Sequence, residues 1–231
     1  MDRRRFLAAA AGAGTLGLAG CIGDTGGGTG GDTDGGDGDT GTPTGTPIED
    51  HPAATDLDAQ PTLGEATDTL IVAFEDPSCT LCRRFERNTY PQLVSDLVEP
   101  GDATFVYRGY PIIYPWGEPA TAVLEATYAA DEAAFWALKD HYYAEQDSFS
   151  TDNVYEASQS FLADGTDVDA EAVVDAARNG EADEAVAVDV DAGETLGIGQ
   201  TPEFYLFADG VFRTVVRGAQ GYDVFESALG G

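Results

Sequence analysis

Residues 72–85 read Val72-Ala-Phe-Glu-Asp-Pro-Ser-Cys79-Thr-Leu-Cys82-Arg-Arg-Phe85, and this stretch decides the fold. The apolar, β-rich run Thr69–Phe74 predicts a buried central strand, which stops at the turn residues Asp76-Pro77-Ser78. Directly after the turn, apolar residues at helical spacing predict a helix from Cys79 to Val98, with Pro91 as a kink. The order strand, turn, cysteine pair, helix places Cys79 at the start of a helix.

The spacing of the two cysteines suits redox chemistry. At a helix N-terminus, unpaired backbone N–H groups and the helix dipole favour the Cys79 thiolate, the form that attacks disulfides. Cys82 lies three residues on, so the two sulfurs can form a bond without unwinding the helix. The same spacing also serves half of a zinc or copper site, for which His51 and His141 are the only histidines in the sequence. A static structural disulfide is another alternative, although closing so short a loop gains little entropy. We expect a redox-active Cys79–Cys82 disulfide, no metal and no other cofactor.

The rest of the folded part predicts two groups of strands separated by helices. Ala103–Tyr107 is a second strand candidate, and residues 118–196 are Ala-rich and mostly helical in pattern. Residues 203–216 predict a hairpin around Asp209-Gly210, and residues 222–229 can close as a helix. The predicted order of elements is βαβ, a helical insert, then ββα.

Two motifs resemble the DsbA-like branch of the thioredoxin superfamily. The first is Phe74-x-Asp76-x-x-Cys79-x-x-Cys82-x-x-Phe85 and the second is Ile198-Gly-Gln-Thr-Pro-Glu-Phe204, with the helical insert between them. The resemblance implies an α/β thioredoxin fold over residues 59–231, with an α-helical insertion between the βαβ and ββα halves. It also implies that Thr201-Pro202 is a cis pair that presents backbone to the bound substrate. From the residues alone, Pro202 opens a strand, where a trans proline is also tolerated.

One position departs from the family pattern. Many relatives carry a buried Glu or Asp six residues before the first cysteine, where this chain has Ala73. We expect the nearby Glu75 and Asp76 to be solvated turn residues. A reductant needs an internal base near its resolving thiol more than an oxidant does, so Ala73 favours an oxidant. Arg83, one helical turn beyond Cys79, is either a support for the thiolate or a plain surface cation.

Residues 1–22 carry the features of an export signal and a lipobox. Arg3-Arg-Arg-Phe-Leu7 opens an apolar stretch that ends in Leu18-Ala-Gly-Cys21 and is shorter than the roughly 20 residues that a spanning helix needs. The arginines resemble a twin-arginine signal, and the cysteine motif resembles a lipobox that makes Cys21 the lipid anchor; the alternative is a small residue in an apolar run. Residues 23–58, rich in Gly, Asp and Thr and including His51, predict a flexible tether. We expect a protein anchored to the outer face of the cell membrane.

The charge balance limits the partners. Asp and Glu number 42 against 11 Lys and Arg, which gives a net charge of -31. Such a surface repels nucleic acid and anionic lipid headgroups, so we expect no nucleic-acid partner. The composition is similar to that of proteins from extreme halophiles.

These observations together predict a thiol-disulfide oxidoreductase that acts on exported protein thiols, as a disulfide donor. Cys79 attacks or is attacked, and Cys82 is the resolving thiol. An unidentified redox partner, in or near the membrane, recycles the pair. Two alternatives stay open: a metallochaperone that carries copper on the two thiolates, and a non-catalytic interaction lipoprotein for which the thioredoxin fold is only a scaffold.

Overall fold

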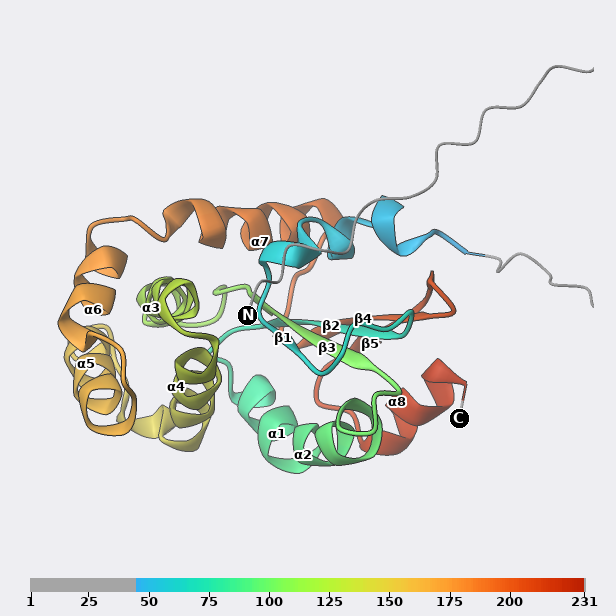
Figure 1. The fold of residues 1–231 in the computed structure, drawn as a ribbon, viewed down its shortest axis with the longest axis horizontal. Helices are drawn as coiled ribbons and strands as arrows, with labels where there is room; N and C mark the ends of the chain where they lie inside the picture. The colour runs from blue at the N-terminus through green and yellow to red at the C-terminus, as the bar shows by residue number, and fades with distance from the viewer. Residues whose placement is uncertain (1–44, 231) are drawn as a thin grey trace, which may run out of the picture. The chain divides into compact units, whose positions relative to one another are not determined.

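The computed structural model describes residues 45–230, which build a mixed β-sheet with helices on both of its faces (Figure 1). The strands are β1 (Thr62–Leu63), β2 (Leu70–Glu75), β3 (Thr104–Gly109), β4 (Glu203–Ala208) and β5 (Val211–Arg217). Their order is β1-β3-β2-β4-β5, with β2 parallel to β3 and antiparallel to β4. Every residue of the central β2 is buried, which the continuous apolar run predicts for residues 70–74 but not for Glu75. The expected thioredoxin layout is confirmed, with β1 added at one edge.

The helix after the cysteines is broken into three pieces. They are α1 (Thr80–Asn88), α2 (Tyr90–Leu93) and the π-helical turn η4 (Val94–Val98). The break lies at Thr89, and Pro91 falls in the first turn of α2, where a missing N–H leaves no helical bond unmade. Figure 1 shows α1 and α2 beside the C-terminal helix α8 (Tyr222–Leu229), on one face of the sheet. Phe85 of α1 packs there against Phe204 of β4, with 4.4 Å between the ring centroids.

The helical insertion, expected at about residues 118–196, occupies Gly117–Leu196. It consists of α3 (Gly117–Ala130), α4 (Glu132–Ala144), the 3-10 turn η5 (Gln146–Ser148), α5 (Val154–Gly165), α6 (Ala170–Arg178) and α7 (Asp183–Leu196). In Figure 1, α3 to α6 gather beyond one end of the sheet and α7 returns along the face opposite α1. The aromatic residues of the insertion belong to the main core or pack against it, as their spacing predicts: Tyr128, Phe135, Trp136, Tyr142, Tyr155 and Phe161.

The segment before β1 packs on the sheet. It forms three 3-10 turns, η1 (Ile48–Asp50), η2 (Pro52–Ala54) and η3 (Leu57–Ala59), and Pro47 pairs with Val211 of β5. Ala53 is fully buried, and the His51 ring stacks on Phe212 with 4.6 Å between centroids. The prediction that the tether extends to residue 58 is therefore wrong for residues 47–58. The predicted signal peptide, the predicted lipid anchor Cys21 and residues 23–44 of the predicted tether lie outside the described residues.

A buried arginine, Arg108, links this segment to the sheet and to α7. Arg108 of β3 and Asp189 of α7 approach to 2.7 Å between Nη1 and Oδ1, with side chains 0% and 1% exposed. The same guanidinium donates through Nε to the carbonyl of Ala53 at 3.0 Å, and through Nη2 to the carbonyl of Thr55. A buried charge that loses its partner is strongly destabilising, so Arg108 fixes β3, α7 and the N-terminal segment together.

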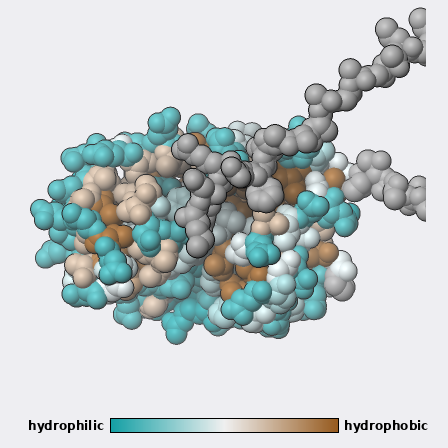
Figure 2. Space-filling view, viewed as in Figure 1, coloured by the Kyte–Doolittle hydropathy of each residue, from teal (hydrophilic) through white to brown (hydrophobic). Residues whose placement is uncertain are grey.

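The outer surface agrees with the acidic composition. Figure 2 shows hydrophilic residues around small hydrophobic patches on one face. Within residues 45–230, no helix has the length and apolar character needed to cross a membrane.

Candidate active site

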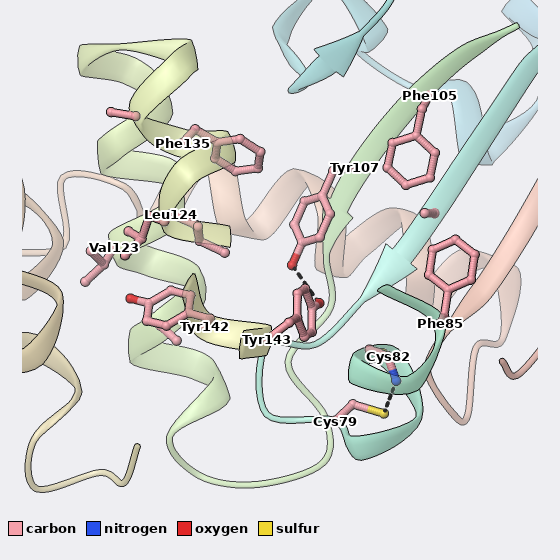
Figure 3. Packing of buried hydrophobic residues seen from close by; sticks show 14 of the residues in the cluster. Cys79, Cys82, Phe85, Phe105, Tyr107, Val123, Leu124, Phe135, Tyr142 and Tyr143 are labelled. Carbon is pink, nitrogen blue, oxygen red and sulfur yellow. Dashed lines mark hydrogen bonds between the residues drawn. The ribbon is translucent and has the colours of Figure 1, made fainter. Parts of the chain in front are cut away.

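Cys79 caps the N-terminus of α1, and its sulfur lies among hydrogen-bond donors. Its Sγ accepts from the backbone N–H of Cys82 at 3.4 Å (Figure 3). The Cys79 thiol also donates to the Thr201 carbonyl oxygen at 3.2 Å. The hydrogen bond from the Cys82 thiol, helped by Thr201 and the N–H groups of Cys82 and Leu81, outweighs burial and lowers the pKa of Cys79 to about 6. Near neutral pH, Cys79 is therefore a thiolate, as its helix-start position predicts.

Cys82 has the opposite character. Its side chain is fully buried, and both cysteines are free thiols in this structure. Burial, then the hydrogen bond to Cys79 and the negative charge of Glu75, raise the pKa of Cys82 well above its usual range. One thiol of the pair is ionised and the other holds its proton, which is the asymmetry that sequential thiol exchange uses.

Glu75 corrects a prediction from the sequence. We expected a solvated turn residue, but Glu75 is the last residue of β2 and is 0% exposed. It points to the same side of the strand as Ala73, two residues earlier, because strand side chains alternate. Neither carboxyl oxygen has a hydrogen-bond partner of regular geometry within residues 45–230. Burial, and then the charge of Glu86, raise the pKa of Glu75 well above its usual range and so favour its protonated form.

A buried cation lies next to this acid. Lys139 of α4, the only lysine in the sequence, is fully buried and its Nζ lies 2.6 Å from Oε2 of Glu86. The ammonium also sits 3.8 Å from the centre of the Tyr90 ring, which adds a cation–π contact. Burial is the largest single effect and opposes the charge of Lys139, but the neighbouring groups, Glu86 first among them, together outweigh burial and raise the pKa of Lys139. Cys82, Glu75 and this ion pair thus form one buried cluster of titratable groups, which no sequence motif predicted.

Asp76 is likewise buried, not solvated as expected. Its carboxylate accepts from the backbone N–H of Ser78 at 2.7 Å, from the Ser78 hydroxyl at 2.6 Å and from the N–H of Ile113 at 2.8 Å. A Cβ on Gly117, the first residue of α3, would lie 2.4 Å from Asp76 Oδ1, so only glycine fits there. Asp76 thereby joins the turn before Cys79 to the loop before α3. That loop and α1 expose apolar side chains beside the cysteines, which we call the apolar rim: Leu81, Ile112, Ile113 and Tyr114.

The other sites expected from the sequence have mixed outcomes. The Thr201-Pro202 peptide bond is cis, as the resemblance implies, and Thr201 lies beside Cys79. Arg83 turns away from the thiolate: its guanidinium pairs with Asp147 at 2.8 Å and donates to the Ala144 carbonyl at 3.3 Å. No group of three or more His, Cys, Asp or Glu side chains is arranged to hold a metal ion in the described part of the chain.

A dithiol at the start of a helix, beside a cis-proline at the start of a neighbouring strand, defines a thioredoxin-fold redox protein. A family model described as thioredoxin matches residues 58–229, and the chain belongs to that family. One curated relative, "Probable disulfide bond formation protein D" of Bacillus anthracis, is 28% identical over 76 residues, which are 33% of this chain and 35% of that protein. The alignment therefore spans about a third of the relative's length.

Two solved structures are similar along most of the chain. BdbD from Bacillus subtilis in its oxidised form has a TM-score of 0.67 and 20% identity, covering 81% of this chain and 97% of that one. Chlamydia trachomatis DsbA has a TM-score of 0.63 and 17% identity, covering 75% of this chain and 89% of that one. The expected DsbA-like fold is confirmed.

Proposed function

We propose that the protein is a thiol-disulfide oxidoreductase that acts on exported proteins as a disulfide donor, through Cys79 and Cys82. The observation that carries the proposal is the asymmetry of the pair: Cys79 lies among N–H donors with its pKa lowered to about 6, and Cys82 is buried with its pKa raised. A stabilised thiolate favours the reduced form of the pair and makes its disulfide a stronger oxidant. No resident metal or organic cofactor is part of this proposal.

The reaction proceeds in two exchanges. A substrate thiolate attacks the Cys79 sulfur of the disulfide, the Cys79–Cys82 bond breaks, and Cys82 leaves with the electron pair. Cys82 takes up a proton, and we assign its supply to Glu75, because burial favours the protonated form of this neighbouring acid. A second substrate thiolate then attacks the substrate sulfur of the mixed disulfide and releases Cys79 as the thiolate. The substrate gains a disulfide, and its two electrons remain on the cysteine pair.

Glu75 also changes the argument about direction. The choice of an oxidant rested on Ala73, since a buried acid was missing there, and Glu75 removes that premise. An internal acid near Cys82 serves exchange in both directions. The disulfide-donor direction therefore depends on the stability of the Cys79 thiolate alone.

The substrate surface is the backbone of Thr201-Pro202 together with the apolar rim. The Thr201 carbonyl faces the Cys79 sulfur at 3.2 Å, so a polypeptide bound beside Pro202 would bring its own cysteine to that sulfur. The rim exposes 43% of Ile112 and 52% of Tyr114, which suits unfolded chains that still expose apolar residues.

A two-cysteine unfolded protein tests this function directly. Oxidised enzyme, mixed with the reduced unfolded protein, is expected to form one substrate disulfide for each enzyme disulfide that is reduced. Cys79→Ser is expected to be inactive. Cys82→Ser, mixed instead with the disulfide-bonded form of the same protein, is expected to accumulate a mixed disulfide on Cys79, because the Cys79 thiolate can attack that disulfide and Cys82 is no longer present to displace the substrate. Accumulation of adducts on Cys79→Ser instead would reverse the roles, and no transfer by the wild type would end the proposal.

The location is a separate part of the proposal. Cys21, after cleavage at the lipobox, would carry the lipid that holds the protein at the outer face of the membrane, where a membrane-bound partner could reoxidise it. Cys21→Ser is expected to yield uncut precursor or protein released from the membrane, while the purified domain keeps its thiol chemistry. Membrane retention of Cys21→Ser at wild-type levels would show that the lipobox interpretation is wrong.

A further inference from the structure

Gln146, in the helical insertion, contacts the turn that presents the nucleophile. Its residue is 5% exposed and opens η5, two positions after α4 ends. The side-chain Nε2 donates to the Pro77 carbonyl at 2.7 Å and to the Cys79 carbonyl at 3.0 Å. Both partners are carbonyl oxygens, which can only accept hydrogen bonds. The orientation of the amide is therefore fixed, with its two N–H groups facing the two carbonyls.

The rest of the Gln146 environment makes this contact specific. Its Oε1 is buried and has no hydrogen-bond partner within residues 45–230, so the amide is held by its donors alone. A second link between the same two segments lies further out, where the Arg83 guanidinium meets Asp147, which is exposed, and the Ala144 carbonyl. The inner link touches the backbone of the nucleophile, and the outer link touches only helix α1.

The position of Cys79 relative to its donors depends on this turn. The carbonyl of Asp76 accepts from the N–H of Cys79 at 2.9 Å, which closes the turn, and the N–H of Cys82 in α1 donates to the sulfur at 3.4 Å. Carbonyl oxygens carry partial negative charge, and two of them lie on the turn beside a thiolate. The N–H groups of Gln146 offset that charge and hold the turn against the insertion.

We propose that Gln146 is a positioning residue for thiol exchange: from the helical insertion it holds the carbonyls of Pro77 and Cys79, and so keeps the Cys79 sulfur aligned with the N–H donors of α1. The insertion thereby acts on the chemistry, in addition to forming part of the core. The proposal rests on the thiol exchange proposed above, and it assigns to Gln146 a share in setting how strongly the pair oxidises.

Three variants separate this role from general packing. Gln146→Met keeps the length of the side chain and removes both donors. Gln146→Glu keeps the shape, and as a buried carboxyl it donates a hydrogen bond only while protonated, at low pH. Asp147→Asn is the matched control, because it weakens the outer link to Arg83 and leaves the two carbonyl contacts in place. All are compared as full-length reduced protein with an intact thermal unfolding transition.

The readouts are the rate of Cys79 alkylation by iodoacetamide and the equilibrium constant with glutathione. Gln146→Met is expected to raise the alkylation midpoint by about half a pH unit, which makes the disulfide about three-fold less oxidising at pH 8 and alkylation about two-fold slower at pH 5. Gln146→Glu, whose protonated carboxyl offers one donor in place of two, is expected to lie between the wild type and Gln146→Met at pH 5 and to be at least as weak an oxidant as Gln146→Met at pH 8. Asp147→Asn is expected to match the wild type at both.

Each result decides between this proposal and its alternatives. If folded Gln146→Met matches Asp147→Asn in midpoint and equilibrium constant, Gln146 has no positioning role. If Gln146→Met does not fold, Gln146→Glu decides: the same deviation at pH 5 and pH 8 indicates a packing defect and overturns the proposal. If wild-type Cys79 alkylates as an ordinary thiol, the proposed function itself fails, and this result precedes any comparison of variants.

Discussion

The lowered pKa of Cys79 predicts a specific pH dependence of stability. In the reduced folded protein the pKa of Cys79 is about 6, against an ordinary value of 9.0. Between these values the unfolded chain binds more protons at this position than the folded chain, so Cys79 stabilises the reduced fold increasingly as pH rises. The contribution is lost as pH falls through about 6. Only 3% of Cys79 is exposed, so solvent screens the effect little.

The magnitude follows from the two pKa values. At pH 7 the free-energy difference is RT times the logarithm of about 11, or about 1.4 kcal/mol, and at pH 8 it is about 2.7 kcal/mol. At pH 5 it is below about 0.1 kcal/mol, which leaves a change of about 2.6 kcal/mol between pH 5 and pH 8. Through the two-electron couple, the pH 7 value corresponds to a disulfide more oxidising by about 30 mV than an unperturbed one.

Denaturant unfolding of reduced wild type and reduced Cys79→Ser, from pH 5 to pH 8, measures this contribution. Serine does not titrate in this range, whereas Glu125 and Asp189, whose pKa values burial raises to about 8 and about 7, titrate in both proteins and cancel in the difference. The wild type is expected to gain about 2.6 kcal/mol relative to Cys79→Ser. The same measurement is repeated in molar salt, where the Debye length is about 3 Å. Distant charges are then screened, but the direct N–H contacts to the sulfur stay effective. A difference that stays flat with pH, or falls, would refute the reasoning.

Three further predictions concern the surroundings of the pair. Glu75→Gln is expected to slow formation of the mixed disulfide from the oxidised enzyme by about ten-fold or more in stopped-flow measurements, while Cys79 alkylation keeps its rate; an unchanged rate of formation would remove Glu75 from the proton transfer. Asp76→Asn, which places an amide against an N–H donor, is expected to raise KM for an unfolded protein several-fold and leave exchange with glutathione unchanged, and equal effects on both would mean that the apolar rim is not a substrate surface. Arg83→Ala is expected to move the pKa of Cys79 by less than about half a unit in molar salt, and a shift above about one unit, equivalent to roughly 1.4 kcal/mol, would contradict the outward orientation of Arg83.

Local signals in the sequence predicted most of the elements. β2 was predicted because residues 70–74 form an uninterrupted apolar run, and α1 was predicted because apolar residues at helical spacing follow the turn after that run. The final hairpin was predicted from Asp209-Gly210, and both residues do adopt positive φ angles, 54° and 77°, which this pair tolerates. The break at Thr89 was less visible, since Pro91 is compatible with either a kink or a new helix start.

The packing of the N-terminal segment could not be predicted from local signals. Residues 47–58 have a tether-like composition, and they are held by Arg108, whose partner Asp189 lies 81 positions further along the chain. A buried arginine leaves no mark on periodicity, because its burial depends on a carboxylate and two carbonyls that only the tertiary fold brings to it. The same holds for Lys139 and Glu86, and for Gln146, whose acceptors are backbone atoms.

Glu75 differs from these cases, because the sequence did contain a signal for it. Side chains of a strand alternate between its two faces, so Glu75 must share a face with Ala73 if β2 continues to its end. The strand was expected to stop at Phe74, and that single residue decided whether Glu75 was a turn residue or a buried acid. The requirement for a proton donor near Cys82 is chemical and does not specify which position of the strand supplies it. The position two residues further along the same face of β2 can meet that requirement. Glu75 therefore provides the buried acid near Cys82 that Ala73 was taken to leave out.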